Sequence, residues 1–318
     1  MTVFSSPFFA RRRLLLLGLV VPLVVVSGWL GHLSLPQPHH FVRRVGGTVN
    51  AEVGPVEAHA GFIGQAVRLV ADTGLSVDFR VVRPAGDERR LPLVILLGGH
   101  RTGRDAVDVV GDPGAMAVAA LNYPYHGPER TRGFWQTLRT VPAVRQGLLD
   151  TPPAVTLALD WLIAQPWVDA SRVELMGVSL GVPFVAVAGA NDSRFSRVWL
   201  IHGGANNREW LASRLESRIK HDAARHAVAW FAHLLAYGPS FDTAEWVTKI
   251  SPSRVVIIGA REDEQMPRES VEQLFAAARE PKQLQWSEGG HVRPHRVDIV
   301  RQLLAMVRSG IEADGDPR

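Results

Sequence analysis

The chain has 318 residues, of which 46% are hydrophobic and 21% charged. These proportions are typical of a soluble globular protein and argue against a disordered or multi-span membrane protein. Cysteine is absent, which excludes disulfides, thiolate metal sites, a cysteine nucleophile and a lipid-modified N-terminal cysteine. The formal charge is only +4 and the arginines are scattered among acids, so we predict no nucleic-acid partner.

The N-terminal segment combines a basic cluster with a long apolar run. Arg11-Arg12-Arg13 is followed by apolar residues from Leu14 to about Leu33, and about 20 apolar residues can span a bilayer. Basic residues favour the cytoplasmic side. Residues 1–33 are therefore predicted to be a membrane anchor or signal segment, with the rest of the chain on the periplasmic or extracellular side. A cleaved signal peptide, which would release a secreted protein, is the open alternative, although its apolar region usually has about 7–15 residues.

The segment after this run lacks periodicity. Residues 34–64 are rich in proline, glycine and histidine, and we predict a linker there. Regular structure is expected to begin near Gln65. The folded domain is assigned to residues 65–310, and residues 311–318 are expected to form a polar tail.

The folded segment alternates β-rich runs with helical patterns. Two runs split by Asp72-Thr73-Gly74 predict an antiparallel hairpin, and continuous apolar runs such as Leu93–Leu97 predict buried parallel strands. The alternation predicts an α/β fold with a mostly parallel sheet, an N-terminal antiparallel hairpin and helices on both faces. The predicted strands are Ala66–Ala71, Leu75–Val82, Leu93–Leu97, Ala115–Leu121, Arg172–Met176, Val198–Ile201 and Val255–Ile258, and the predicted helical segments are Ala154–Gln165, Leu180–Ala190, Asn206–Lys249, Val271–Arg279 and Ile299–Arg308.

One pentapeptide carries a chemical signal. Gly177-Val178-Ser179-Leu180-Gly181 is a Gly-x-Ser-x-Gly motif between a predicted strand and a predicted helix. This context is the one that a nucleophile elbow requires: the glycines let strand and helix approach closely, and the strained turn exposes the serine hydroxyl above the sheet. Ser179 is therefore the predicted nucleophile.

A serine hydroxyl needs a histidine base and an acid that orients the base. Three carboxylates follow the predicted strand Val255–Ile258. Asp263 is favoured, because Pro267 lies four residues further on and helps to fix the loop. Glu262 and Glu264 remain open as alternatives.

The predicted base is His291, which precedes the last predicted helix. The adjacent Gly289 and Gly290 would allow the loop to place the imidazole over the elbow. His295 is the rival, and Pro294 disfavours one helix that presents both histidines. The sequence contains no His-Glu-x-x-His motif and no histidine–carboxylate cluster with convincing ligand spacing, so we predict no catalytic metal and no cofactor.

The developing oxyanion needs two donors. One should be the backbone N–H of Leu180, directly after the nucleophile, and the other should come from the loop after Leu93–Leu97. Gly99 or His100 is the predicted second donor. His202-Gly203-Gly204 resembles an oxyanion motif but follows the strand after the elbow, so a structural or pocket-wall role is expected.

With these residues in place, the chain resembles the α/β-hydrolase superfamily, and within it the dienelactone-hydrolase-like and prolyl-oligopeptidase-like serine esterases. The resemblance runs from about Gln65 to Arg308 and implies an α/β-hydrolase fold that cleaves esters, thioesters or amides through an acyl-serine. The loop at Gly98-Gly99-His100 departs from the usual His-Gly start. The most specific matches are Met176–Gly181, Asp263–Pro267 and Gly290-His291, and weaker ones are Asp72–Gly74, Arg83-Pro84, Tyr123–Gly127 and Asp169–Arg172.

Residues 206–249 form a predicted helical insertion. It is expected either to pack on the core or to form a lid that walls an acyl pocket, with Phe134 and Trp135 as an opposite wall. The resemblance implies a carboxylesterase acting on a small-molecule or lipid-like ester. A non-catalytic, membrane-anchored binding protein and a peptidase of the same superfamily are the alternatives. No oligomeric state is predicted.

Overall fold

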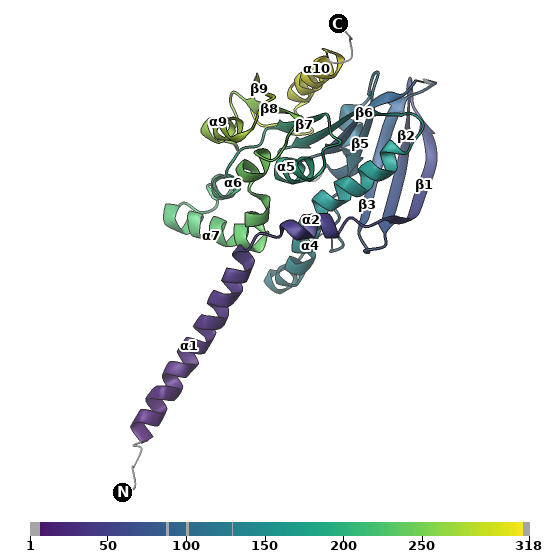
Figure 1. The fold of residues 1–318 in the computed structure, drawn as a ribbon. Helices are drawn as coiled ribbons and strands as arrows, with labels where there is room; N and C mark the ends of the chain where they lie inside the picture. Colours follow the sequence, from purple (N-terminus) through teal and green to yellow (C-terminus); the bar gives the residue numbers. More distant parts are fainter. Residues whose placement is uncertain (1–6, 87–88, 100–101, 129, 314–318) are drawn as a thin grey trace.

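The computed structural model describes residues 7–86, 89–99, 102–128 and 130–313, without the side chains of residues 7–19, 134 and 313. In this part of the chain nine strands form one sheet, in the order β1-β2-β3-β5-β4-β6-β7-β8-β9 (Figure 1). Along this order the pairs β1-β2, β2-β3 and β3-β5 are antiparallel, and every later pair, from β5-β4 to β8-β9, is parallel. The strands are β1 (Thr48–Ala58), β2 (Phe62–Ala71), β3 (Ser76–Pro84), β4 (Leu91–Leu97), β5 (Ala117–Leu121), β6 (Val168–Val178), β7 (Arg197–Ile201), β8 (Arg254–Ala260) and β9 (Lys282–Ser287).

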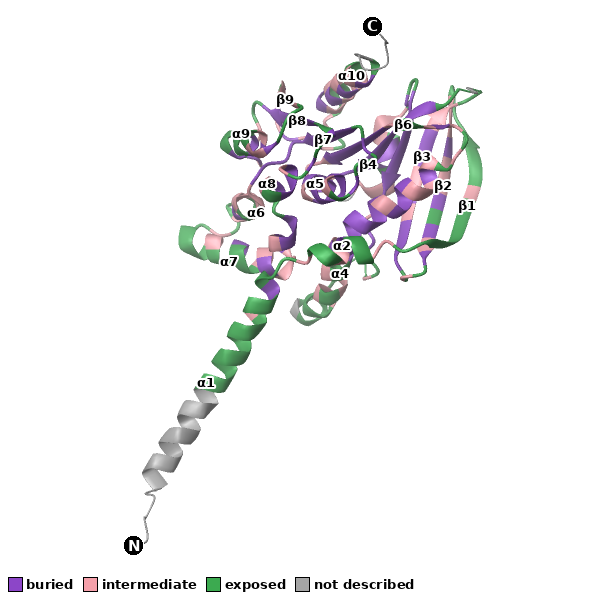
Figure 2. Ribbon diagram, viewed as in Figure 1, coloured by how far each residue is buried: buried purple, intermediate pink, exposed green. Residues whose placement is uncertain are grey.

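Helices cover both faces of this sheet. The alternation of buried side chains along β4 shows why: Leu93, Ile95 and Leu97 belong to one core cluster, and Val94 and Leu96 to the other. The first cluster includes residues of α4, α5, α8 and α9, and the second includes residues of α3 and α10. The sheet is purple, and therefore buried, through most of its width in Figure 2. The helices are α1 (Pro7–Ser34), α2 (Pro38–Arg43), α3 (Ala106–Val110), α4 (Phe134–Ile163), α5 (Gly181–Asn191), α6 (Asn207–Leu215), α7 (Asp222–Leu235), α8 (Thr243–Val247), α9 (Arg268–Ala277) and α10 (Val297–Ala313), with short 3-10 helices η1 (Gly103–Asp105) and η2 (Gly238–Phe241).

The predicted hairpin and parallel strands are confirmed, because each falls within or overlaps an observed strand from β2 to β8. Helix α4 is longer than predicted. It begins at Phe134 and contains Pro142, Pro152 and Pro153, and prolines in a helix interior argue against a helix in sequence-based reasoning.

The prediction of an irregular linker at residues 34–64 is wrong. Helix α2 places Phe41 in the core at 3% exposure, and β1 pairs with β2 along its length. Strand β1 lies at the sheet edge and is almost fully exposed, and its pairing is shifted between Val53 and Val56, where Gly54 and Pro55 lie. Proline and glycine are tolerated in edge strands at such irregularities, which is why the sequence pattern concealed the strand.

The structure describes the two end segments of the chain only in part. Helix α1 extends away from the domain (Figure 1), and residues 1–6 of the predicted anchor, with the side chains of residues 7–19, lie outside the description. No helix among the described residues has the length and apolar character needed to cross a membrane. Residues 311–313 of the predicted polar tail belong to α10, and residues 314–318 are not described.

Candidate active site

Ser179 lies on the turn between β6 and α5, as the elbow motif predicts. Its φ of +53° is in the left-handed region, which is strained for a residue with a side chain. The flanking glycines permit this turn: a Cβ on Gly177 would lie 2.8 Å from the Gly181 carbonyl oxygen, and one on Gly181 would collide with the Leu97 carbonyl. The Ser179 N–H donates to the Ile201 carbonyl at 2.8 Å, which fixes the turn to the next strand.

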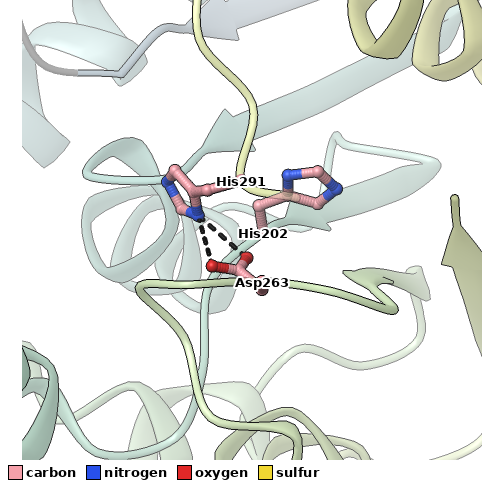
Figure 3. Close-up of side chains that lie close together, drawn as sticks. All are labelled: His202, Asp263 and His291. Carbon is pink, nitrogen blue, oxygen red and sulfur yellow. Dashed lines mark hydrogen bonds and ion pairs between the residues drawn. The ribbon is translucent and has the colours of Figure 1, made fainter. Parts of the chain in front are cut away.

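The structure brings Ser179, His291 and Asp263 together. The Oγ of Ser179 lies 2.7 Å from the Nε2 of His291, and the Nδ1 of His291 lies 2.8 Å from a carboxylate oxygen of Asp263. Figure 3 shows the ring of His291 facing that carboxylate. The side chains of His291 and Asp263 are each 3% exposed, so water competes little for their hydrogen bonds.

The three candidate acids occupy different positions. Asp263 alone among them contacts the His291 ring, and its Oδ1 also accepts from the N–H groups of Gln265 and Met266. Glu262 is exposed, and its N–H donates to the Gly289 carbonyl.

The Glu264 side chain holds the loop of His291 by accepting a hydrogen bond from the backbone of that loop. Its Oε2 accepts from the His291 N–H at 2.9 Å, and its Oε1 accepts from Arg293 and pairs with Arg296. Partial desolvation opposes ionisation, but the backbone N–H of His291 and the Arg296 guanidinium lower the pKa of Glu264 to about 2. Sequence reasoning considered Glu264 only as an orienting acid and missed this role.

The two candidate bases are also separated. His291 is buried against Ser179. His295 is exposed and lines a large cavity beside the site.

The predicted oxyanion donors lie near Ser179 where they are described. A Cβ on Gly99 would lie 3.5 Å from the Ser179 Cβ, so the Gly99 backbone passes close to Ser179. Leu180 is the first residue before α5, and N–H groups at a helix start have no acceptor within the helix. His100 lies outside the described residues.

Two side chains hold the loop that contains Gly99. The Tyr123 hydroxyl donates to the Gly98 carbonyl at 2.7 Å, and the Thr102 hydroxyl donates to the Gly99 carbonyl at 2.8 Å. Burial raises the pKa of Tyr123, so its hydroxyl remains a donor. Tyr123 lies two residues after the end of β5, and this position was the available sequence signal for the contact.

His202 holds the loop of His291 from the opposite side. It is fully buried, with a φ of +52°, and its Nδ1 accepts from the Val292 N–H at 2.9 Å. Because a backbone N–H can only donate, the ring proton of neutral His202 is on Nε2, which lies 2.9 Å from the Ser287 Oγ. His202 therefore has a structural role, because it anchors the loop of His291 beside Ser179.

The ligand atoms of His202, Asp263 and His291 lie within 4.8 Å of one another, a spacing that could hold a metal ion. Both nitrogens of His202 are hydrogen-bonded to Val292 and Ser287, and both nitrogens of His291 contact Ser179 and Asp263. A metal would have to displace these bonds. The donor set fits a hydrogen-bond network better than a metal centre.

His202 leads to a prediction about pH and stability. Burial lowers the pKa of His202 to about 4, whereas an unfolded histidine has a pKa of about 6.5. Between these values the unfolded chain binds more protons, so stability is full above about pH 6.5 and falls as pH is lowered toward 4. The contribution of His202 amounts to at most about 3 kcal/mol. Urea unfolding between pH 7.5 and 4.5 should show a shallower pH dependence in His202→Gln than in the wild type, and equal slopes would contradict the assignment.

The helical insertion walls a small cavity at Ser179. Trp210 and Leu211 of α6 and Ala236, just after α7, line this cavity. Trp135, expected on an opposite wall, is 72% exposed, and the Phe134 side chain is outside the described set. Residues of the insertion therefore line a cavity beside Ser179, and its role as a lid stays a prediction.

Comparison with solved structures places this arrangement among hydrolase folds. An acetyl xylan esterase from Paenibacillus sp. R4 is similar at a TM-score of 0.58 and 18% identity, covering 83% of this chain and 88% of that one. Acetyl xylan esterase 1 from Thermoanaerobacterium sp. JW/SL YS485 gives 0.57 and 14%, covering 85% and 94%. The α/β hydrolase GrgF from Penicillium sp. sh18 gives 0.56 and 19%, covering 79% and 98%.

No family model matches the sequence, and no curated protein matches it. At these levels of identity, similarity to solved structures supports a shared fold. The strand order, the elbow after β6 and the match over most of each compared chain agree with one another. The chain has the α/β-hydrolase fold.

Proposed function

We propose that this protein is a serine hydrolase that cleaves carboxylic esters, or thioesters, through an acyl-serine intermediate. The observation that carries the proposal is the continuous hydrogen-bonded chain from the Ser179 Oγ through His291 to the buried Asp263 carboxylate. Its similarity in fold to two acetyl xylan esterases supports the proposal.

The geometry suggests a separate catalytic role for each of the three side chains. The Nε2 of His291 is within reach of the Ser179 proton, so it can accept that proton as Oγ attacks the ester carbonyl carbon. Asp263 holds the proton on Nδ1, which keeps Nε2 free to accept, and it stabilises the imidazolium that forms.

The carbonyl oxygen becomes negatively charged in this step. The N–H of Leu180 and an N–H from the loop at Gly99 or His100 are the proposed donors, and one such donor is worth roughly 3 kcal/mol in the transition state. His291 then returns its proton to the leaving alcohol oxygen as the bond from carbon to that oxygen breaks. Water attacks the acyl-serine by the same route, releasing the acid and restoring the Ser179 hydroxyl.

A fluorophosphonate probe tests this proposal, because it phosphonylates only an activated serine. The wild type should be labelled, His291→Ala should lose labelling, and His295→Ala should keep it. Circular dichroism would establish that each variant is folded. A folded wild type that resists several such probes would contradict the proposal and favour a binding protein without catalysis.

We also propose that residues 1–33 hold the hydrolase domain on the periplasmic or extracellular side of a membrane. The support is the arginine cluster at 11–13 followed by the apolar run. Protease added to intact spheroplasts of the expressing cells should digest the domain. Protection of the domain until the cells are lysed would contradict this location.

A further inference from the structure

Two cavities meet at Ser179. The small one has a volume of about 150 Å³ and lies over the α4 and α5 layer, where Leu148, Phe184 and Trp210 wall it. The large one has a volume of about 650 Å³ and lies over the other layer, between α3 and α10, where Val110 and Val300 face it. Ser179 lines both cavities.

His291 distinguishes the two cavities. It lines the large cavity, and it is absent from the described wall of the small one. In the mechanism proposed above, His291 must reach the oxygen of the leaving alcohol to protonate it. The alcohol half of the ester should therefore leave through the large cavity, and the acyl half should lie in the small one.

The small cavity limits the acyl group in size and charge. An apolar cavity of about 150 Å³ can hold a benzene-sized group. Leu180, Pro183 and Phe241 complete its largely apolar wall. Its described wall contains one titratable histidine, His233, and burial lowers the pKa of that histidine, so it provides no cation near pH 7. A carboxylated acyl group would find no counter-charge there.

The large cavity suits a different group. Most of its wall is apolar, with Val109 from α3 and Val307 from α10 among its residues, and Arg214, Gln265 and His295 add polar groups. Its volume falls in the range of pockets that bind drug-sized ligands. Arg293 also lines this cavity and is paired with Glu264. A sugar would leave many hydroxyls against apolar walls, at a desolvation cost.

We propose that the substrate of this protein joins a compact, uncharged acyl group, of about benzene size or smaller, to a bulky apolar alcohol. The inference rests on the proposed function, since it assigns the cavities by the path of the proton. This substrate differs from acetyl xylan, for which two of the structurally similar esterases are named.

Two ester series test the assignment in the full chain. Among p-nitrophenyl esters, kcat/KM should be highest for butanoate or benzoate and at least tenfold lower for decanoate and for the monoester of succinate. Among butanoates, octyl should exceed ethyl at least tenfold, although the two alcohols have similar acidity. Glyceryl should not exceed ethyl, although glycerol is the more acidic alcohol and the better leaving group. The alcohol series therefore separates the effects of the size and polarity of the alcohol group from the effect of its acidity as a leaving group.

Tryptophan substitutions then locate each selectivity. Val300→Trp should lower the octyl-to-ethyl ratio of kcat/KM at least tenfold, whereas its matched control Val297→Trp, at a 58% exposed position on the same helix, should keep that ratio. Leu148→Trp should lower the benzoate-to-acetate ratio at least tenfold, and Val144→Trp, 41% exposed on α4, should keep it.

The outcomes separate this inference from the proposed function. If esters are cleaved but the preferences are reversed, or if Val300→Trp changes acyl selectivity instead of alcohol selectivity, the inference fails and the hydrolase proposal stands. If the folded wild type cleaves no ester and takes up no fluorophosphonate, the proposed function itself fails and this inference fails with it.

Discussion

Replacing Ser179 with alanine is expected to lower kcat for ester hydrolysis by a factor on the order of 10⁴–10⁶. The loss is large because the substitution removes the only atom proposed to form the covalent bond to the acyl group. His291 would keep its contact with Asp263 but would have no hydroxyl to activate. Steady-state kinetics on p-nitrophenyl butanoate, with fluorophosphonate labelling of the same preparation, measure the effect.

A control for this substitution lies on β6, the strand that precedes Ser179. Ser171 is exposed near the start of β6, at the other end of the strand from Ser179, so Ser171→Ala should keep activity and labelling. The backbone at Ser179 is left-handed, and alanine has nearly the same steric cost there as serine, so the unfolding temperature should remain close to that of the wild type. Full activity in folded Ser179→Ala would remove the acyl-serine mechanism.

The parallel strands were predictable because they are buried on both faces. Such strands read as continuous apolar runs, as Leu91–Leu97 does. Edge strands lack this signal: β1 is exposed and contains Gly54 and Pro55, and β9 is a short edge strand with polar residues at Lys282, Gln283 and Gln285. Their place in the sheet depends on hydrogen bonds to a neighbouring strand, which local composition does not encode.

The same distinction applies to the site. The position of Ser179 on the turn between β6 and α5 was predictable, because such a turn imposes local glycine spacing. His291 lies 112 residues further along the chain, yet its short-range glycine context and the expected order of serine, acid and base located it. The role of His202 was less specific in the sequence, because it depends on the N–H of Val292, 90 residues away. A backbone group has the same chemistry at every position, so no residue type signals this contact.

Substituting Asp263 with asparagine is expected to lower kcat by about 10⁴ while leaving the protein folded. The asparagine amide can donate to Nδ1 of His291, which would move the ring proton to Nε2. A protonated Nε2 cannot accept the proton of Ser179, so the base would be present in the wrong tautomer. Measuring kcat over pH 6–9 tests this cause. The wrong tautomer is already a neutral imidazole, so raising the pH should not restore kcat, and the loss should persist across the whole range.

The neighbouring acids provide matched comparisons with the same change from carboxylate to amide. Glu262→Gln should keep kcat near the wild-type value, since the Glu262 side chain is exposed and its backbone makes the contact to Gly289. Glu264→Gln should cost less than tenfold, because the amide oxygen can still accept from the His291 N–H while the pairing with Arg296 weakens. If Glu262→Gln lost 10⁴ and Asp263→Asn did not, the orienting acid would be Glu262. The burial of Asp263 at 3% exposure and its 2.8 Å contact with Nδ1 argue for the opposite result, because only a carboxylate held in place and shielded from water can keep the histidine in one tautomer through both proton transfers.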